Sequence, residues 1–194
     1  DGGNVGIINE LTIISRVTTN INENEIYNAL CDCDVIILKN MIFSDFHNSI
    51  KIFLNGRLIG IHKDPIYLYK YMKLLKLNSI INITTSISFN KKTEEFHVFC
   101  DSGRIIRPIF RLIIKNGKKF NSLISKDYSK LKNWGTCIHG LLYNDENPID
   151  FYSNQYHKDY LEEIKSEHKE RFLDYLENNS APIEYVDSIE SEDI

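Results

Sequence analysis

Residues 50–61 read Ile50-Lys-Ile-Phe-Leu-Asn-Gly-Arg-Leu-Ile-Gly-Ile61, two apolar runs on either side of an Asn–Gly pair. Asn55 and Gly56 favour a type I′ turn, because both central residues of that turn need a positive φ angle. The flanking runs are rich in β-branched residues, which is typical of strands. The stretch therefore predicts an antiparallel β-hairpin, on which neighbouring segments can pack.

A helix is predicted directly after this hairpin. Asp64 can accept backbone N–H bonds as an N-cap residue, and Pro65 suits the first helical position. Residues 66–77 then place apolar side chains at helical spacing. Three lysines occupy another face of this helix, and we interpret them as a solvated face, with contacts to phosphate as the alternative. These lysines are Lys70, Lys73 and Lys76.

Three more strands are predicted downstream. Residues 81–89 alternate apolar and polar side chains, as a half-buried strand does, and residues 96–100 and 105–114 also read as strands. Pro108 lies inside the last of these, which implies an edge position or a bulge. Asp101-Ser-Gly103 precedes it and predicts a tight turn with Gly103 at a positive φ angle.

The predicted fold class is α+β, with small mixed or antiparallel sheets, packed helices and two small domains. Residues 50–115 are expected to form a compact sheet with one helix, and residues 6–17 read as a separate strand. The composition shifts at a soft boundary near residues 116–120. Beyond it, residues 156–176 read as one long charged helix, and residues 183–186 as a short strand before an acidic tail.

The composition is that of an ordinary globular protein, with 42% hydrophobic and 26% charged residues in a chain of 194. Its net charge of −4 argues against a free nucleic-acid-binding protein, which usually carries a strong basic excess. No apolar run approaches the roughly 20 residues that span a bilayer, so we expect no membrane partner. The chain opens with Asp-Gly-Gly rather than Met, and we expect it to be cut from a longer protein.

The four cysteines are interpreted as reduced thiols of an intracellular protein. The alternative is a zinc site built from Cys31, Cys33, Cys137 and His139. These C-x-C and C-x-H spacings are tighter than the usual C-x2-C pattern of zinc ligands. We therefore expect no bound metal.

A self-contained active site is not predicted. The sequence has no P-loop and no dense aspartate cluster that could hold two Mg²⁺ ions. The Asp101-Ser102 pair has no histidine at motif spacing, and such a pair in a turn usually serves the turn itself. We expect no catalytic residue in this chain.

Four short motifs follow one another along the chain, and their order carries information as well as their residues. They are Asp-Gly-Gly-Asn-Val-Gly-Ile-Ile-Asn-Glu-Leu at residues 1–11, Phe-Leu-Asn-Gly-Arg-Leu-Ile-Gly-Ile-His at 53–62, Phe-Cys-Asp-Ser-Gly-Arg-Ile-Ile-Arg-Pro at 99–108, and Ile-Glu-Tyr-Val-Asp at 183–187. Together they resemble the middle of the second-largest subunit of multisubunit DNA-directed RNA polymerases, the counterpart of the bacterial beta subunit. The chain departs from the family pattern at residues 20–48 and 116–180, and the second stretch resembles a lineage-specific helical insertion.

The resemblance implies a division of the chain. Residues 1–19 would end the fork region, which lines the active-centre cleft near the template and the RNA–DNA hybrid, and Asn4 and Ile8 fall on cleft-lining positions. Residues 20–115 would correspond to the first external domain of the archaeal, eukaryotic and large-virus enzymes, and residues 116–194 to the second. These domains brace the outside of the subunit.

The resemblance also implies partners and a location. The partners would be the largest polymerase subunit, smaller polymerase subunits, the DNA template and the RNA–DNA hybrid. The family's Mg²⁺-binding aspartates lie in the largest subunit, so no cofactor is expected in this piece and the chain alone should be inactive. The location would be the nucleus or cytoplasm. A viral factory or virion is the alternative, because abundant Ile, Asn, Lys and Tyr with scarce Ala are typical of an AT-rich coding sequence, which favours a large DNA virus or an AT-rich eukaryote as the source.

The motifs single out a set of structural residues, which are Asn55, Gly56, Asp101, Gly103, Arg104, Arg107 and Pro108. Arg104 and Arg107 are three apart on a predicted strand, so we expect them on opposite faces. One should pair with a carboxylate inside the fold, and the other should reach an interface or be solvated. Two other classes stay open, namely a stand-alone protein-interaction module and a small zinc-binding nucleic-acid protein.

Overall fold

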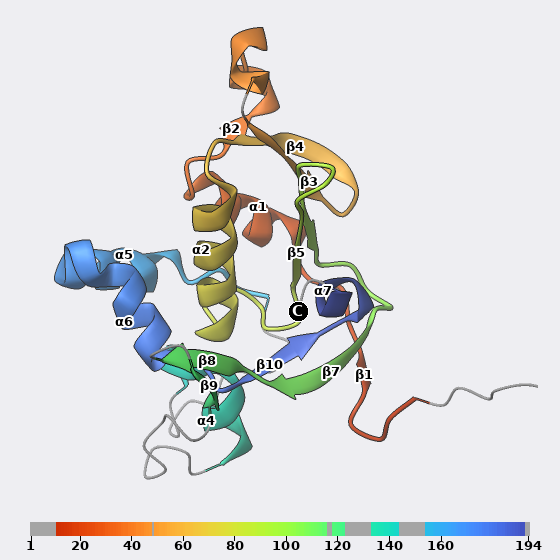
Figure 1. The fold of residues 1–194 in the computed structure, drawn as a ribbon, viewed down its shortest axis with the longest axis vertical. Coiled ribbons are helices and arrows are strands. Elements are labelled where there is room, and N and C mark those ends of the chain that lie inside the picture. Colours follow the sequence, from red (N-terminus) through yellow and green to blue (C-terminus); the bar gives the residue numbers. More distant parts are fainter. Residues whose placement is uncertain (1–10, 48, 116–117, 123–132, 144–153, 193–194) are drawn as a thin grey trace, which may run out of the picture.

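The computed structural model describes residues 11–47, 49–115, 118–122, 133–143 and 154–192. Its largest layer is a five-stranded mixed sheet with the order β2-β4-β3-β6-β5, drawn in the upper part of Figure 1. Strands β3 and β6 run parallel, and the other neighbours are antiparallel. The strands are β2 (Ile36–Ile37), β3 (Ile50–Leu54), β4 (Arg57–His62), β5 (Ser86–Asn90) and β6 (Glu95–Phe99).

The predicted hairpin is confirmed as β3 and β4. Asn55 and Gly56 form its turn with φ angles of 48° and 77°. The Asn55 side chain also reaches the next strand, where its Oδ1 accepts the Cys100 N–H over 2.8 Å. The turn residue therefore joins the hairpin to the chain that follows β6.

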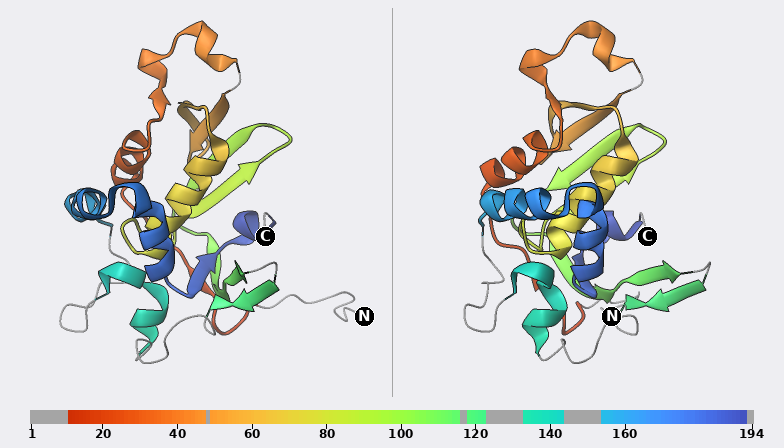
Figure 2. Two further views of the ribbon diagram at one scale, coloured as in Figure 1. Left: turned by 60° about the vertical axis from the view of Figure 1, so that its left-hand side comes forward. Right: turned by 90° about the vertical axis from the view of Figure 1, so that its left-hand side faces the viewer.

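The predicted helix is confirmed as α2 (Pro65–Leu77). Asp64 Oδ1 accepts the N–H groups of Ile66 and Tyr67 over 3.1 and 3.0 Å, and Pro65 occupies the first turn. Helix α2 packs on the sheet beside α1 (Glu23–Cys31), as two further views in Figure 2 show. The core between them is apolar and includes Ile52, Leu54, Leu68, Met72, Leu75, Phe96 and Val98.

A second sheet of three strands joins distant parts of the chain. Its order is β1 (Arg16–Val17), β7 (Ile105–Phe110) and β10 (Ile183–Val186), all antiparallel. Ile105 and Ile106 of β7 pair with β1, so among the described strands Pro108 has a neighbour only on the β10 side. This local edge position agrees with the prediction for Pro108, which has no N–H to give a second neighbour. The hairpin of β8 (Leu112–Lys115) and β9 (Lys118–Asn121) follows.

Three predicted elements have different bounds in the structure. The strand expected at residues 81–89 begins only at Ser86, although Ile81 and Ile83 are buried in the preceding loop. The strand expected at 105–114 is interrupted at Arg111, whose guanidinium donates to Ser180 Oγ over 2.7 Å. Of the strand expected at 6–17, the described part contains only β1, and residues 1–10 lie outside the described residues.

The long helix expected at residues 156–176 is broken. Helix α5 (Lys158–His168) ends at Lys169, which has a φ angle of 31°, and α6 (Phe172–Asn179) follows a single 3₁₀ turn, η5 (Lys169–Arg171). The break lets both helices bury apolar side chains in the same core, because α5 and α6 take different directions (Figure 1). None of the described helices is long and apolar enough to cross a membrane.

The remaining helical elements are short. They are α4 (Trp134–Ile138), α7 (Ser188–Glu192), and the 3₁₀ turns η1 (Leu38–Asn40), η2 (Phe43–Phe46) and η4 (Gly140–Leu142). Helices beside small antiparallel and mixed sheets confirm the predicted α+β class.

Candidate functional site

The Asp101–Gly103 turn is fixed by a threonine that the sequence did not single out. Gly103 has a φ angle of 87°, as predicted. Thr18 accepts the Gly103 N–H through its carbonyl over 3.0 Å, and its own N–H donates to the Arg104 carbonyl over 2.9 Å. The Thr18 hydroxyl donates to the Asp101 carbonyl over 2.9 Å and accepts the Arg104 N–H over 3.0 Å. The turn and the end of β1 are therefore held as one unit.

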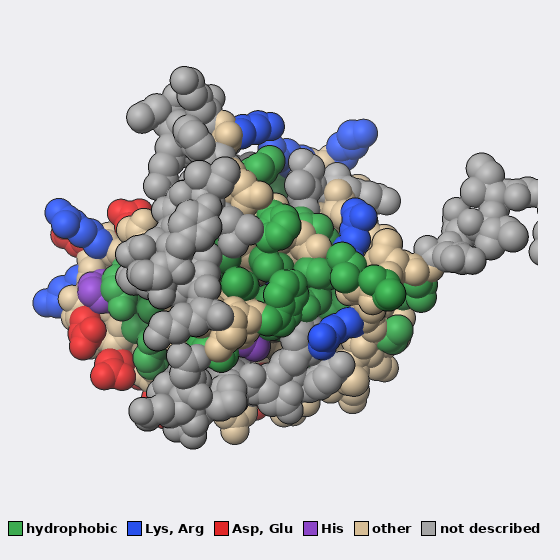
Figure 3. All heavy atoms as spheres, turned by 90° about the horizontal axis from the view of Figure 1, so that it is seen from below, with side chains coloured by type: hydrophobic (Ala, Val, Ile, Leu, Met, Phe, Trp, Pro, Cys, Tyr) green, Lys and Arg blue, Asp and Glu red, His purple; other side chains and the backbone are tan. Residues whose placement is uncertain are grey.

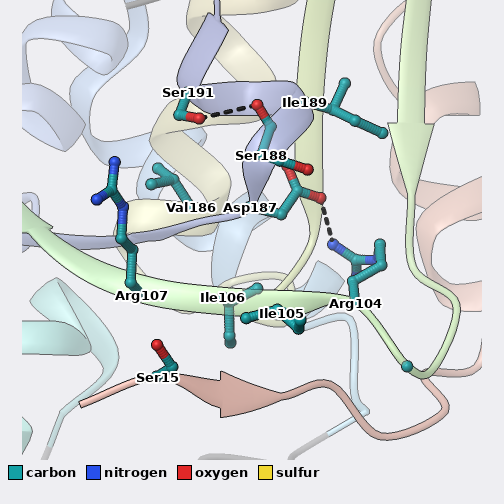
Figure 4. Close-up of a pocket in the computed structure, with 11 residues that line it drawn as sticks. Ser15, Arg104, Ile105, Ile106, Arg107, Val186, Asp187, Ser188, Ile189 and Ser191 are labelled. Carbon is teal, nitrogen blue, oxygen red and sulfur yellow. Dashed lines mark hydrogen bonds and ion pairs between the residues drawn. The ribbon is translucent and has the colours of Figure 1, made fainter. Parts of the chain in front are cut away.

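Arg104 lies at the centre of this unit. Its Nη1 donates to Asp187 Oδ2 over 3.0 Å, its Nε to Asp101 Oδ1 over 2.9 Å, and its Nη2 to the Thr84 carbonyl over 3.0 Å. Figure 4 shows the guanidinium directed at Asp187. The prediction that one arginine of the motif pairs with a carboxylate inside the fold is confirmed for Arg104.

Asp187 is held ionised by its surroundings. Burial alone would raise the pKa of this carboxyl, but the Glu190 N–H and the Arg104 guanidinium outweigh burial and lower the pKa. The N–H bond spans 2.9 Å. Both charges of the Arg104–Asp187 pair are therefore matched.

Arg107 has a different environment. It is exposed on β7, where its backbone pairs with Val186, and its side chain makes no hydrogen bond or ion pair to any residue that the structure describes. Arg104 and Arg107 both line one hollow of about 540 Å³ and point toward the same side in Figure 4. The expectation of opposite faces is wrong because Arg104 precedes β7, so strand alternation does not extend to it.

The lysines of α2 are not a uniform solvated face. Lys70 agrees with that expectation, because its side chain is 45% exposed and its Nζ lies 2.8 Å from Glu177 Oε2. Lys73 and Lys76 contradict it, because their side chains are 11% and 1% exposed. Their partners are Glu184 of the strand expected at 183–186 and Glu190 of the expected acidic tail, and both carboxylates are buried.

Two lysines and two glutamates form a closed charge cluster. Lys73 Nζ lies 2.6 Å from Glu184 Oε1 and also contacts Glu190 Oε1, and Lys76 Nζ lies 2.7 Å from Glu190 Oε2. Lys76 Nζ also lies 3.2 Å from Glu184 Oε1. The cluster is electrically neutral, and it connects α2 to both β10 and α7.

The cluster controls the ionisation of its members. Burial would raise the pKa of the Glu184 carboxyl, but Lys76 and Lys73 outweigh burial and lower the pKa to about 2. Burial would lower the pKa of Lys73, but Glu184 and Glu190 outweigh it and raise the pKa. Burial raises the pKa of Glu190, and the lysines oppose this only in part.

The candidate zinc ligands have other surroundings. The buried Cys33 thiol donates to the Ala29 carbonyl over 3.0 Å, and burial raises its pKa. His139 Nδ1 lies 2.9 Å from Ser79 Oγ. Among the described residues no group of three His, Cys, Asp or Glu side chains is placed to hold a metal ion. Asn4 and Ile8, the candidate cleft-lining residues, lie outside the described residues.

Comparison with known proteins gives the family. The family described as RNA polymerase Rpb2, domain 4 matches residues 52–113, from β3 into β8. The chain is 30% identical over 132 residues to DNA-directed RNA polymerase II subunit RPB2 of Encephalitozoon cuniculi, which covers 68% of the chain and 11% of that subunit. The chain belongs to the second-largest-subunit family of DNA-directed RNA polymerases.

Two further relatives match the chain, one over its whole length and one over about half of it. The RPB2 subunit of Meyerozyma guilliermondii is 27% identical over 194 residues, all of this chain and 14% of that subunit. DNA-directed RNA polymerase subunit 2 of Acanthamoeba polyphaga mimivirus is 25% identical over 53% of the chain and 9% of its own length. The chain thus spans only about a tenth of the length of these second-largest subunits. The motif residues from Asn55 to Pro108 all lie inside the matched domain.

Proposed function

We propose that this chain is a bracing segment of a DNA-directed RNA polymerase, an enzyme that joins ribonucleotides on a DNA template. In this proposal residues 1–19 end the fork region, residues 20–115 form the first external domain and residues 116–194 the second. The segment holds the second-largest subunit together beside the active-centre cleft and performs no chemical step itself.

The observation that carries the bracing role is the arrangement around Arg104. One guanidinium joins the 101–103 turn, the loop before β5 and the end of β10, and Thr18 adds the end of β1 to the same point. The buried Asp187 carboxylate and the Arg104 guanidinium are committed to each other, so neither is free to act on a substrate. Charged residues that are buried and paired in this way hold the segments of the fold together.

An exposed apolar face supports assembly with other polypeptide. Figure 3, a view from below, shows hydrophobic side chains gathered on this side of the molecule. Among the side chains that the structure describes, the exposed apolar ones of β1, β7 and β8 are Val17, Ile105, Phe110 and Leu112, each between 49% and 61% exposed. Large apolar patches mark surfaces that another protein covers. We assign this face to contacts with the rest of the polymerase, including its largest and smaller subunits.

The buried carboxylates of the described residues are committed to cationic side chains. Three buried carboxylates, Glu184, Asp187 and Glu190, already bind Lys73, Lys76 and Arg104. A magnesium ion needs oxygen ligands that are not committed to such partners. The proposal therefore assigns the Mg²⁺ of the parent enzyme to another subunit. Contacts of Asn4 and Ile8 with the template and hybrid stay a prediction, as does a location in the nucleus, the cytoplasm or a viral compartment.

A reconstitution experiment tests the proposal. Val17→Asp with Ile105→Asp changes a directly paired, exposed couple of β1 and β7. In the full polypeptide that carries these residues, the double variant should fold normally, as judged by circular dichroism and thermal melting. It should co-purify with the largest polymerase subunit at least about tenfold less than the parent does.

Leu38→Asp is the matched control, because Leu38 is 43% exposed and follows β2 at the opposite end of the molecule in Figure 1. It should leave assembly unchanged. Normal assembly of the double variant would contradict the interface. Failure of the parent polypeptide to join any polymerase subunit would favour a stand-alone interaction module.

A further inference from the structure

A second and larger hollow adjoins the Arg104 site, and Ile189 lines both hollows. The larger hollow has a volume of about 970 Å³, and it lies at β5, which ends the five-stranded sheet and pairs only with β6 among the described strands. Its apolar wall comes from four elements and includes Ile66 from α2, Phe89 from β5, Phe99 from β6 and Ile189 from α7. Ile66 is 74% exposed and Ile189 41%, so the wall is open to a partner.

The charge of this hollow differs from that of the whole chain. Lys91 and Lys92 in the β5–β6 turn line it and are exposed, and none of its described lining residues is acidic. The turn is ordered, because Asn90 Oδ1 accepts the Lys92 N–H over 2.9 Å. Since the chain carries a net charge of −4, this basic rim is a local feature.

Aromatic rings at this hollow already stack on one another. His97 lies between Phe53 and Phe99, with ring centroids 4.9 and 5.9 Å away and interplanar angles of 14° and 3°. His97 Nε2 lies 3.5 Å from Glu95 Oε2, and Glu95 does not line the hollow. His97 therefore already stacks with two aromatic rings of the protein, and a nucleic-acid base would have to compete with them for the stacking that single-stranded nucleic-acid sites use.

We propose that this hollow is a docking site for an acidic segment of a protein partner that carries aliphatic or aromatic side chains. The partner's carboxylates pair with Lys91 and Lys92, and its apolar side chain enters the wall formed by Ile66, Phe99 and Ile189. The partner fills the hollow rather than adding a strand, because the Ile87 N–H of β5 already donates to Glu190 Oε1 of α7 over 3.4 Å. A hollow of this volume falls in the range of about 300–1,000 Å³ typical of binding pockets.

Fluorescence anisotropy on the full polypeptide that carries residues 1–194 tests the proposal. The probe is a labelled, blocked ten-residue peptide that alternates Glu with Leu and Phe. The comparison probes are the same peptide with Lys in place of Glu, and a ten-nucleotide single-stranded RNA. The acidic peptide should bind at least about tenfold more tightly than either comparison probe, and added salt should weaken it.

Two variants locate the binding. Lys91→Glu with Lys92→Glu should weaken the binding of the acidic peptide at least about tenfold, and Ile66→Asn should weaken it without changing its salt dependence, because Asn adds no charge. Lys169→Glu is the control, because it removes an exposed lysine outside the hollow's lining. Equal binding of acidic and basic peptides, tighter binding of the RNA, or undiminished binding by the two hollow variants would each overturn the proposal.

Discussion

Arg104 and Asp187 lie 83 residues apart in the sequence, and they form an ion pair of 3.0 Å that connects the turn before β7 to the end of β10. The pair is mostly buried, with side chains 11% and 3% exposed. Removing one member leaves the other charge in a site from which water is largely excluded. The pair is therefore where the bracing role should be most sensitive to mutation.

Arg104→Ala should lower the free energy of unfolding by about 3–5 kcal/mol, because it leaves Asp187 buried without its cation. Arg107→Ala is the matched control on the same motif and should change it by no more than about 0.5 kcal/mol, since Arg107 is exposed. Urea unfolding of both variants measures the difference. Equal losses would show that the Arg104 pair adds no stability of its own.

Two glycine-to-alanine substitutions should destabilise the protein by different amounts and for different reasons. Gly103→Ala should cost about 1 kcal/mol, because φ is 87° but a Cβ would meet no atom within 4 Å. Gly60→Ala should cost about 3 kcal/mol or more, because its Cβ would collide with the Ile36 carbonyl oxygen of β2. Thermal melting of the two variants side by side measures the order, and a larger loss at Gly103 would contradict it.

The buried cluster should distinguish the lysines of α2. Lys76→Met should lower the free energy of unfolding by about 3–5 kcal/mol, because Glu190 loses the partner of its Oε2 atom. Lys70→Met should change it by about 0.5 kcal/mol or less, since the Lys70–Glu177 pair is exposed.

A second substitution separates charge from packing at this cluster. Lys76→Met combined with Glu190→Leu should recover part of the loss, because an apolar replacement leaves fewer uncompensated charges. Chemical denaturation of the single and double variants measures the recovery. A double variant that is less stable than Lys76→Met by the full cost of a second cavity would refute the charge explanation.

Stability should fall in acid because of Glu184. The pKa of this carboxyl is about 2 in the folded protein, against 4.5 for an ordinary glutamate, so the unfolded chain binds the proton first as the pH falls. The contribution of Glu184 is therefore complete above about pH 5 and is lost as the pH falls toward 2. Urea unfolding at a series of pH values from neutral to about pH 3 should show this decline.

Glu184→Gln should be less stable at neutral pH and should flatten the decline between about pH 5 and 3. Glu170→Gln removes an exposed carboxyl and should keep the decline of the parent protein. An unchanged decline in Glu184→Gln would show that other carboxyls, such as Asp187, control the acid response.

The sequence by itself determined the features that depend on near neighbours in the chain. Asn55-Gly56 specified its turn, Asp64-Pro65 began α2, and Gly103 took the positive φ angle that a side chain would disfavour. Each of these is a local backbone preference, which a few consecutive residues settle. The ordered motifs indicated the family for the same reason, because they can be read without knowing what packs on them.

Only the tertiary structure decided which charged side chains are buried and paired, and where the longer elements end. Lys73 and Lys76 read as a solvated stripe because their partners, Glu184 and Glu190, lie 111 to 117 residues away. The helix expected at 156–176 broke at Lys169 because burying side chains of both halves in one core outweighs continuous helical hydrogen bonding. Burial and ion pairing depend on which segments meet in space, and local spacing does not contain that information.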